Sequence, residues 1–186
     1  MRLFAAFRRP VEEAAAETLY RLIVAQSREP VFYAELGVPD TPDGRYDMII
    51  AHVVLVLRRL NRAHLATAGL AQALFDLMFA DMDQNLREMG VGDLAVGKRV
   101  KGMAMAFYGR LAAYDAALSS ANSAALQAAL IRNLFRKTMP TDAQVAAVAA
   151  YLRQEAARLD LEPLQALVSG RLRFGPVLTT GLGDRT

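Results

Sequence analysis

Apolar and polar positions recur with a helical period along most of the chain. After a first turn rich in glutamate, Leu19, Leu22 and Ile23 share one helix face, and leucines and methionines recur every three or four residues between 70 and 89. This spacing places apolar side chains on one side of a helix, where they pack on a core. The pattern predicts helices over residues 11–28, 30–37, 46–62, 70–89, 97–119, 122–137, 141–159 and 162–169.

Turn and capping residues separate these helices. Residues 38–45 (VPDTPDGR) are the densest turn signal in the chain, Gly90 suits a left-handed cap, and Thr141 suits an N-cap. No run with a period of two and no internal repeat stands out. We therefore expect an all-α protein, a single-domain helical bundle of about seven to eight helices.

The two ends of the chain differ from its middle. We expect residues 1–10 (MRLFAAFRRP) to form an N-terminal arm, residues 11–169 the helical domain, and residues 170–186, with their Gly and Pro breakers, a loosely held tail. The arm either meets anionic head groups through its arginines or is a frayed end packed on the body, and the second interpretation ranks first. Its apolar part is too short for a signal peptide, so we expect a cytoplasmic protein.

The longest apolar run, Met48–Leu57, predicts a buried core helix. Its ten residues are half of the roughly 20 that a membrane-spanning helix needs.

Composition excludes several classes of chemistry. The 186 residues are 54% apolar, carry a formal charge of +3 and include no cysteine. Disulfides, thiolate metal sites and cysteine nucleophiles are therefore excluded. His52 and His64 are the two histidines, and a lone core histidine is usually satisfied by a backbone carbonyl. We expect no catalytic residue, no metal site and no cofactor.

Residues 92–99 (GDLAVGKR) match the spacing of a phosphate-binding loop through Gly92, Gly97 and Lys98. The context differs, because a helix is expected before the motif and Arg99 stands where Ser or Thr would hold magnesium. We interpret the segment as a helix connection.

Charge is unevenly distributed along the chain. Residues 70–90 hold four acidic residues and one arginine, whereas residues 91–140 hold seven basic residues and two acidic ones. One interpretation is that the two helices pair through complementary charge. The other is a basic face for ribosomal RNA, anionic lipid or an acidic protein, made of Lys98, Arg99, Lys101, Arg132, Arg136 and Lys137.

A stripe of small residues, Gly102, Ala106, Gly109 and Ala113, lies on one side of a predicted helix. An internal helix crossing is the first interpretation of this stripe, and a groove for an incoming client helix is the second. Methionine adapts to varied apolar partners, so Met103 beside the stripe favours the second use. The candidate client-binding or partner-binding residues are Gly102, Met103, Ala106, Phe107 and Gly109.

The turn-rich loop also has two interpretations. Asp40, Asp43 and Gly44 form a rigid brace against the next helix or a docking feature, and the brace ranks slightly ahead.

Two stretches of the sequence resemble the ubiquinol–cytochrome c chaperone family. They are FYAELGVPDTPDGRYD (32–47) and FDLMFADMDQNLREMGVGDLAVGKRVK (75–101), within a similarity that covers roughly residues 15–160. The resemblance implies an all-helical, non-enzymatic chaperone that binds newly made cytochrome b and supports assembly of the cytochrome bc1 complex. Mitochondrial members of this family work with a small partner protein and near the ribosomal exit tunnel.

We expect no import presequence, so the chain resembles a bacterial member that works at the cytoplasmic side of the inner membrane. The partners implied are cytochrome b as client, a small partner protein, and the ribosome or an anionic membrane surface, with no DNA. A different class, a peripheral lipid- or quinone-binding helical module, would also explain the apolar residues and the basic face.

Overall fold

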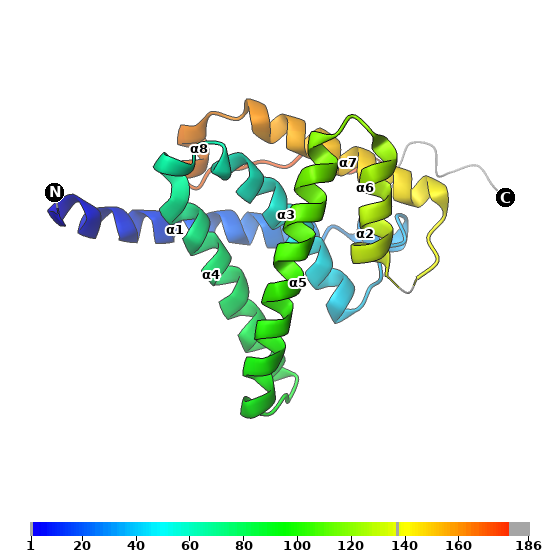
Figure 1. The fold of residues 1–186 in the computed structure, drawn as a ribbon, viewed down its shortest axis with the longest axis horizontal. Coiled ribbons are helices and arrows are strands. Elements are labelled where there is room, and N and C mark those ends of the chain that lie inside the picture. The colour runs from blue at the N-terminus through cyan, green and yellow to red at the C-terminus, as the bar shows by residue number, and fades with distance from the viewer. Residues whose placement is uncertain (1, 137, 179–186) are drawn as a thin grey trace.

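The computed structural model describes residues 2–136 and 138–178, and all regular structure in this part of the chain is helical (Figure 1). The elements are α1 (Arg2–Ser27), α2 (Pro30–Ala34), α3 (Pro42–Asn61), α4 (His64–Glu88), α5 (Asp93–Ser119), α6 (Ser123–Leu130), a π-helical turn η1 (Ile131–Phe135), α7 (Asp142–Leu161) and α8 (Leu164–Val168). The predicted all-α, single-domain fold is confirmed.

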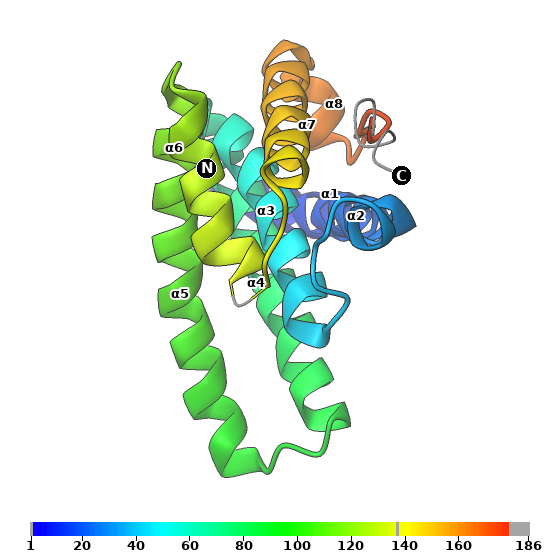
Figure 2. The same ribbon diagram turned by 90° about the vertical axis from the view of Figure 1, so that its right-hand side faces the viewer.

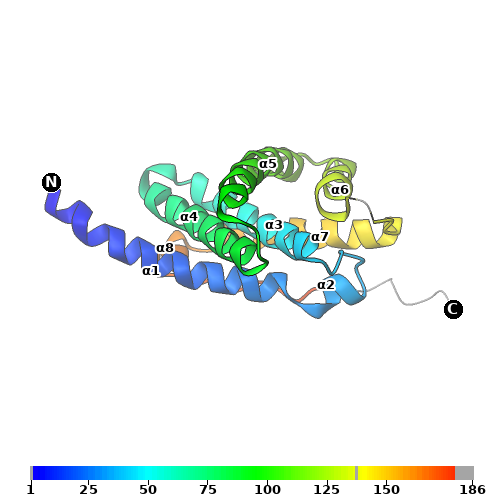
Figure 3. The same cartoon turned by 90° about the horizontal axis from the view of Figure 1, so that it is seen from below.

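Helix α3 is the centre of the molecule because its apolar run is covered on all sides. Every side chain from Asp47 to Leu57 is buried, and α3 packs against α1, α4, α5, α7 and η1. Helices α1 and α2 lie on one side of α3, and α5 and α6 lie on the other (Figures 2 and 3). The buried helix predicted from the run at 48–57 is confirmed.

Helix α3 begins four residues earlier than expected. Thr41 is the N-cap, and its Oγ1 accepts a hydrogen bond from the Gly44 N–H at 3.1 Å, with Pro42 in the first turn. Thr, Pro and Asp favour turns and helix starts alike, so the turn-rich segment includes the first turn of the helix.

Helices α4 and α5 form a hairpin that projects from the rest of the molecule (Figures 1 and 2). Gly90 has a φ of 78° in its connection, which confirms the predicted left-handed cap. A small separate core of Met82, Leu86 and Val96 holds the far end of the hairpin together. Helix α4 is long and apolar enough by composition to cross a membrane, yet its stripe of Leu70, Leu74 and Met78 is buried against the body.

The helix predicted over 122–137 is interrupted. Helix α6 continues into the π-helical turn, which buries Leu134 and Phe135, and Arg136 then adopts a φ of 50°. A positive φ is unfavourable for a residue with a Cβ, so surrounding contacts must hold it. Thr141 then caps α7 in a complete capping box with Gln144, as the N-cap prediction requires.

Both ends of the described chain contain structure that the sequence pattern did not predict. The backbone of α1 is helical from Arg2 and runs through Pro10, beyond the body of the molecule (Figure 3). Residues 170–178 are not a loosely held tail, since Leu172 is buried and the Gly175 N–H donates to Glu155 at 3.0 Å. Residues 179–186 lie outside the described part.

Candidate functional site

A groove opens where the start of α3, the end of α4, the middle of α5 and the residue after η1 meet. Its volume is about 320 Å3. We call it the α3–α5 groove, and its lining residues are Asp43, Tyr46, Asp47, Leu86, Arg99, Gly102, Met103, Ala106, Arg110 and Arg136. These include members of all three residue sets predicted from the sequence. Residues far apart in the chain are thus collected at one surface.

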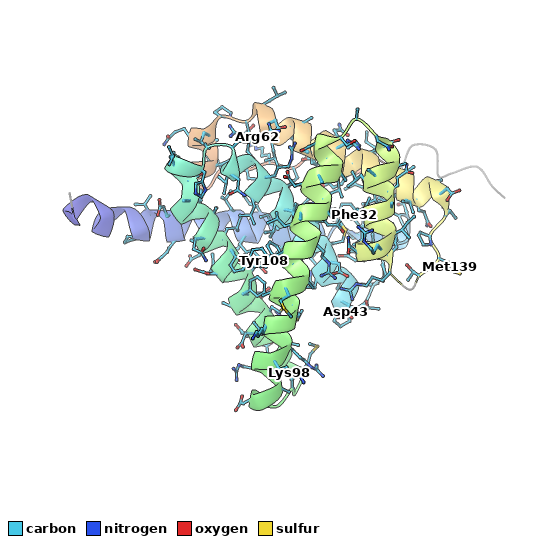
Figure 4. All side chains as sticks on the ribbon, in the orientation of Figure 1. Phe32, Asp43, Arg62, Lys98, Tyr108 and Met139 are labelled. Atoms are coloured by element: carbon cyan, nitrogen blue, oxygen red, sulfur yellow. The ribbon has the colours of Figure 1, made fainter. Side chains whose placement is uncertain are left out.

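A second hollow of about 440 Å3 adjoins the α3–α5 groove around the first turns of α3. The two hollows share Asp43, Tyr46, Leu86 and Met103, and the second adds Met82 and Met89. Figure 4 shows Asp43 at the start of α3. Methionine is flexible and polarisable, so it packs on apolar surfaces of varied shape.

The floor of the α3–α5 groove is made by small residues of α5. Gly102 and Ala106 are exposed, and a Cβ placed on Gly102 or on Gly109 would meet no described atom within 4 Å. Gly102, Ala106 and Gly109 are therefore not part of an internal helix crossing, because no neighbouring element covers them, whereas Ala113 at the end of the stripe is half-buried against the core. The uncovered part of the stripe leaves space in which the backbone of another helix can approach α5 closely.

An ion-pair network centred on buried Asp47 joins the walls of the groove. Asp47 is 1% exposed and accepts a hydrogen bond from Arg136 Nη2 at 2.9 Å, while Arg136 Nε lies 2.7 Å from its other carboxylate oxygen. Arg110 Nη2 lies 3.1 Å from Asp47, and Arg136 Nη1 lies 3.6 Å from Asp43. These contacts hold Arg136 in its positive-φ conformation and tie α3 to α5 and η1.

Burial and the arginines act on Asp47 in opposite directions. Removal from water raises the pKa of Asp47 to about 6, and the two neighbouring guanidinium groups offset part of that rise. At neutral pH Asp47 is therefore mainly ionised.

Four buried polar atoms in and beside this network have no hydrogen-bond partner among the described residues. One is Oδ2 of Asp47, which still lies 2.7 Å from Arg136 Nε in the ion pair, and the other three are the Tyr46 hydroxyl, the Tyr114 hydroxyl and Nε of Arg110. Burial also raises the pKa of Tyr46, so its hydroxyl keeps its proton and remains a donor. A buried donor without an acceptor is costly, which makes this cluster unusual for a purely structural network.

The predicted client-binding residues divide into those that line the groove, one that is exposed outside it, and one that is buried. Gly102, Met103 and Ala106 line the α3–α5 groove, and Gly109 is exposed one turn beyond it. The prediction for Phe107 is wrong. Its side chain is fully buried and packs edge-on against Phe75 and Phe79 of α4. Helical periodicity shows that Phe107 and the small-residue stripe lie on different sides of α5. It does not show that α4 covers the side that carries Phe107.

The predicted basic face is only partly assembled. Arg99 and Arg136 line the same groove, but Arg136 is held by Asp43 and Asp47. Lys98 and Lys101 are exposed, and Figure 4 shows Lys98 near the end of the hairpin. Arg132 is exposed on η1, and Lys137 lies outside the described residues.

The loop residues have the contacts of a brace. Asp40 pairs with Arg45 at 2.5 Å, and Asp43 pairs with Arg136. A Cβ on buried Gly44 would clash with the Pro39 carbonyl oxygen, so only glycine fits there. Asp43 also lines both hollows, so the same segment forms part of the groove wall.

The segment that matches a phosphate-binding loop is helical. Helix α5 begins at Asp93, which places Gly97 and Lys98 within regular helix and leaves no loop to surround a phosphate. His52 is fully buried, with Nδ1 2.9 Å from the Met48 carbonyl oxygen and Nε2 2.9 Å from the Tyr151 hydroxyl. Within the described residues, no cluster of His, Asp or Glu is arranged to hold a metal ion.

A larger hollow of about 760 Å3 lies between α1 and α4. Glu12, Glu17 and Asp76 give it an acidic rim, and the Glu12 side chain packs directly on Gly69. Acidic side chains on exposed helix faces are common, so this hollow alone indicates no ligand.

Sequence reasoning missed Tyr46, Asp47 and Arg110. One signal was available for Asp47, because an acidic residue directly precedes the apolar run 48–57 and so requires a buried cationic partner. The identity of that partner depends on a contact between residues 89 positions apart.

Comparison with known proteins identifies the family. The model of the ubiquinol-cytochrome C chaperone family matches residues 34–174. Ubiquinol-cytochrome c reductase complex assembly factor 1 of Mus musculus is 25% identical over 165 residues, which are 88% of this chain and 56% of the relative. Its counterpart from Xenopus laevis is 24% identical over 165 residues, or 88% of this chain and 82% of the relative.

The crystal structure of the Cbp3 homolog from Brucella abortus superposes with a TM-score of 0.83 at 40% identity, covering 94% of this chain and 97% of the other. This chain spans little more than half the length of the mouse relative. The match over most of the chain, the shared helical fold and the sequence identity agree. The chain belongs to the ubiquinol-cytochrome c chaperone family.

Proposed function

We propose that this protein is an assembly chaperone for the ubiquinol–cytochrome c reductase (bc1) complex and that it binds newly made cytochrome b in the α3–α5 groove. Family membership supports the assembly role, as do relatives whose names describe assembly factors of that complex. The observation that carries the binding site is the uncovered floor of Gly102 and Ala106 beside Met103. It is suited to the close approach of a helix.

The energetics suit temporary binding. Burial of about 400 Å2 of apolar surface is worth about 10 kcal/mol before the costs of association, and those costs are of similar size. The groove would therefore hold an apolar segment with modest affinity and release it for membrane insertion. No bond needs to form or break, so the proposed role is non-enzymatic and needs no cofactor.

The proposed location is the cytoplasmic face of the inner membrane, where a membrane-protein client is inserted. The exposed Lys98 and Lys101 at the end of the α4–α5 hairpin would meet an anionic membrane surface or the ribosome. A small partner protein, as in mitochondrial members of the family, is part of the same proposal.

The test is crosslinking in cells that make this protein, followed by pull-down and mass spectrometry. Cytochrome b should be enriched with the wild-type chain and depleted with Gly102→Leu, because leucine fills the groove floor. The matched control is Gly97→Leu on the same helix. A Cβ at either glycine would meet no described atom within 4 Å, so both variants should keep the wild-type melting temperature.

Capture of cytochrome b that is equal in the wild type and in Gly102→Leu would place the client elsewhere on the molecule. Absence of cytochrome b from every sample, together with co-purified lipid or quinone, would favour the alternative of a peripheral lipid- or quinone-binding module.

A further inference from the structure

Hydrogen-bond donors outnumber acceptors in the α3–α5 groove. Arg99, Arg110 and Arg136 face it, against the carboxylates of Asp43 and Asp47. Asp47 is already occupied by Arg110 and Arg136, and Asp43 by Arg136. Arg99 has no ion-pair or hydrogen-bond partner in the described part of the chain.

Two buried donors add to this excess. The Tyr46 hydroxyl and Nε of Arg110 have no described acceptor, although both side chains line the groove. Oδ2 of Asp47 also accepts no hydrogen bond, but its charge is met by Arg136 Nε at 2.7 Å. Buried polar groups are satisfied in nearly all folded proteins, so unpaired donors at the wall of a groove indicate that an acceptor is supplied from outside.

We infer that the α3–α5 groove recognises a carboxylate, an Asp or Glu side chain carried on an otherwise apolar helical segment of the bound protein. This inference rests on the proposed function, since it names the chemical group of the client that the groove selects. The segment would lie over Gly102 and Ala106, and its carboxylate would accept hydrogen bonds from Arg99 and Tyr46.

The charge in the groove favours a singly charged group. Three arginines against two aspartates leave one excess positive charge, which a carboxylate neutralises. A phosphate group would bring up to two negative charges beside Asp43 and Asp47, and the repulsion would oppose it. A basic side chain is also disfavoured, because the three arginines of the groove would repel it. The apolar end of the groove, Leu86 and Met103, accounts for the apolar character of the segment.

Asp47 is a positioning residue in this arrangement. The buried Asp47 carboxylate holds the guanidinium groups of Arg110 and Arg136 in place. Arg136 makes this contact with a backbone φ of 50°. The donors are thus oriented before the carboxylate arrives, which lowers the entropy cost of binding.

The test compares two synthetic 20-residue helical peptides of leucine and alanine. They are identical except for one central residue, Glu in the first and Gln in the second. Fluorescence anisotropy should show that wild-type protein binds the Glu peptide at least about tenfold more tightly, as expected for hydrogen bonds to a charged group. Tyr46→Phe and Arg99→Gln should each remove most of this preference.

Two controls separate recognition from folding. Tyr46→Phe removes a hydroxyl that has no described partner, so the free protein should melt at the wild-type temperature or higher. Lys98→Gln lies on the same helix outside the groove lining and should retain the preference for Glu.

Equal affinity for the two peptides, binding of neither, or a full preference for Glu in both Tyr46→Phe and Arg99→Gln would overturn the inference. These peptides contain no cytochrome b sequence. Their result is therefore separate from the capture experiment, and cytochrome b capture by a protein that ignores the carboxylate would leave the proposed function standing.

Discussion

At the scale of single residues, His52 shows how this core accommodates polar groups. Its two ring nitrogens are shared among the Met48 carbonyl, the Ser27 hydroxyl at 3.0 Å and the Tyr151 hydroxyl. Phe32 and Phe174 pack edge-on against the ring and exclude water. Burial therefore lowers the pKa of His52 to about 4, because the charged ring would lose its hydration.

This shift predicts a pH dependence of stability. The folded pKa of His52 lies below its ordinary value of 6.5, so the neutral ring contributes stability above pH 6.5 that is lost as the pH falls toward 4. The loss amounts to at most about 3 kcal/mol. Melting curves of wild type and His52→Gln between pH 7.5 and 4.5 should show the advantage of the wild type shrinking as the pH falls.

The difference between the two proteins is the informative quantity. Burial raises the pKa values of Asp47 and Glu155, and a raised carboxyl pKa makes stability fall as the pH rises through the same window. Both carboxyl groups remain in His52→Gln, so their contributions cancel in the comparison. An advantage that stays constant across the window would show that the ring is not kept neutral by the fold.

At the scale of elements, the α4–α5 hairpin separates apolar and cationic surfaces. Met82, Leu86 and Val96 face inward between the two helices, whereas Lys98, Arg99 and Lys101 are exposed. Arg87 pairs with Asp83 on its own helix and with Asp93 across the connection. The link between the helices therefore joins an arginine of α4 to an aspartate of α5, the reverse of the predicted pairing between acidic residues of 70–90 and basic residues of 91–140. Lys98, Arg99 and Lys101 form no ion pair with a described residue, unlike Arg110 further along α5, which pairs with Asp47.

Reversal of this charge should release the protein from its proposed surface. The triple variant Lys98→Glu, Arg99→Glu and Lys101→Glu should sediment less than the wild type with inner-membrane vesicles or ribosomes at low salt, since screening weakens exposed charges. A control that reverses the exposed Arg21, Arg171 and Arg173 changes the net charge equally, away from the hairpin. Equal sedimentation of wild type and the α5 variant would remove the basic face from the proposal.

At the scale of the whole molecule, the C-terminal segment of the described chain packs against its first helix. Residues 170–178 pass between α1 and α7, where Gly170 sits against Ala15 and Thr18. Gln26 donates to the Gly175 carbonyl at 3.3 Å and to the Tyr151 hydroxyl at 3.0 Å. The segment at residues 170–178 therefore connects α1 and α7 beside the buried His52.

Truncation after Ser169 should therefore destabilise the whole protein. It removes buried Leu172, half-buried Phe174 and the hydrogen bonds of Gly175, together worth about 5 kcal/mol. For a chain of this size the melting temperature should fall by at least about 10 °C. Truncation after Leu178 removes only residues outside the described part and is the matched control. Equal melting of both truncated proteins would mean that the segment contributes little.

Short-range patterns in the sequence were sufficient to predict the helices and several of their ends. The helical period identified the long helices, the run at 48–57 identified the central one, and Gly90 and Thr141 marked two boundaries. Each depends on residues within a turn or two of one another, and the stretches at 32–47 and 75–101 were specific enough to indicate the family. Boundaries at residues 42 and 93 were missed because turn residues also start helices.

The groove was decided by tertiary structure. Periodicity shows which residues share a helix face, but the element that covers each face is set by contacts between distant segments. For this reason Phe107 is buried under α4 while Gly102 is open, and Asp47 meets Arg110 and Arg136 across three elements. The sequence by itself determined the helices, the apolar centre and the family. Only the packing of α3 against α5 and η1 brought the small, basic and acidic residues into one site.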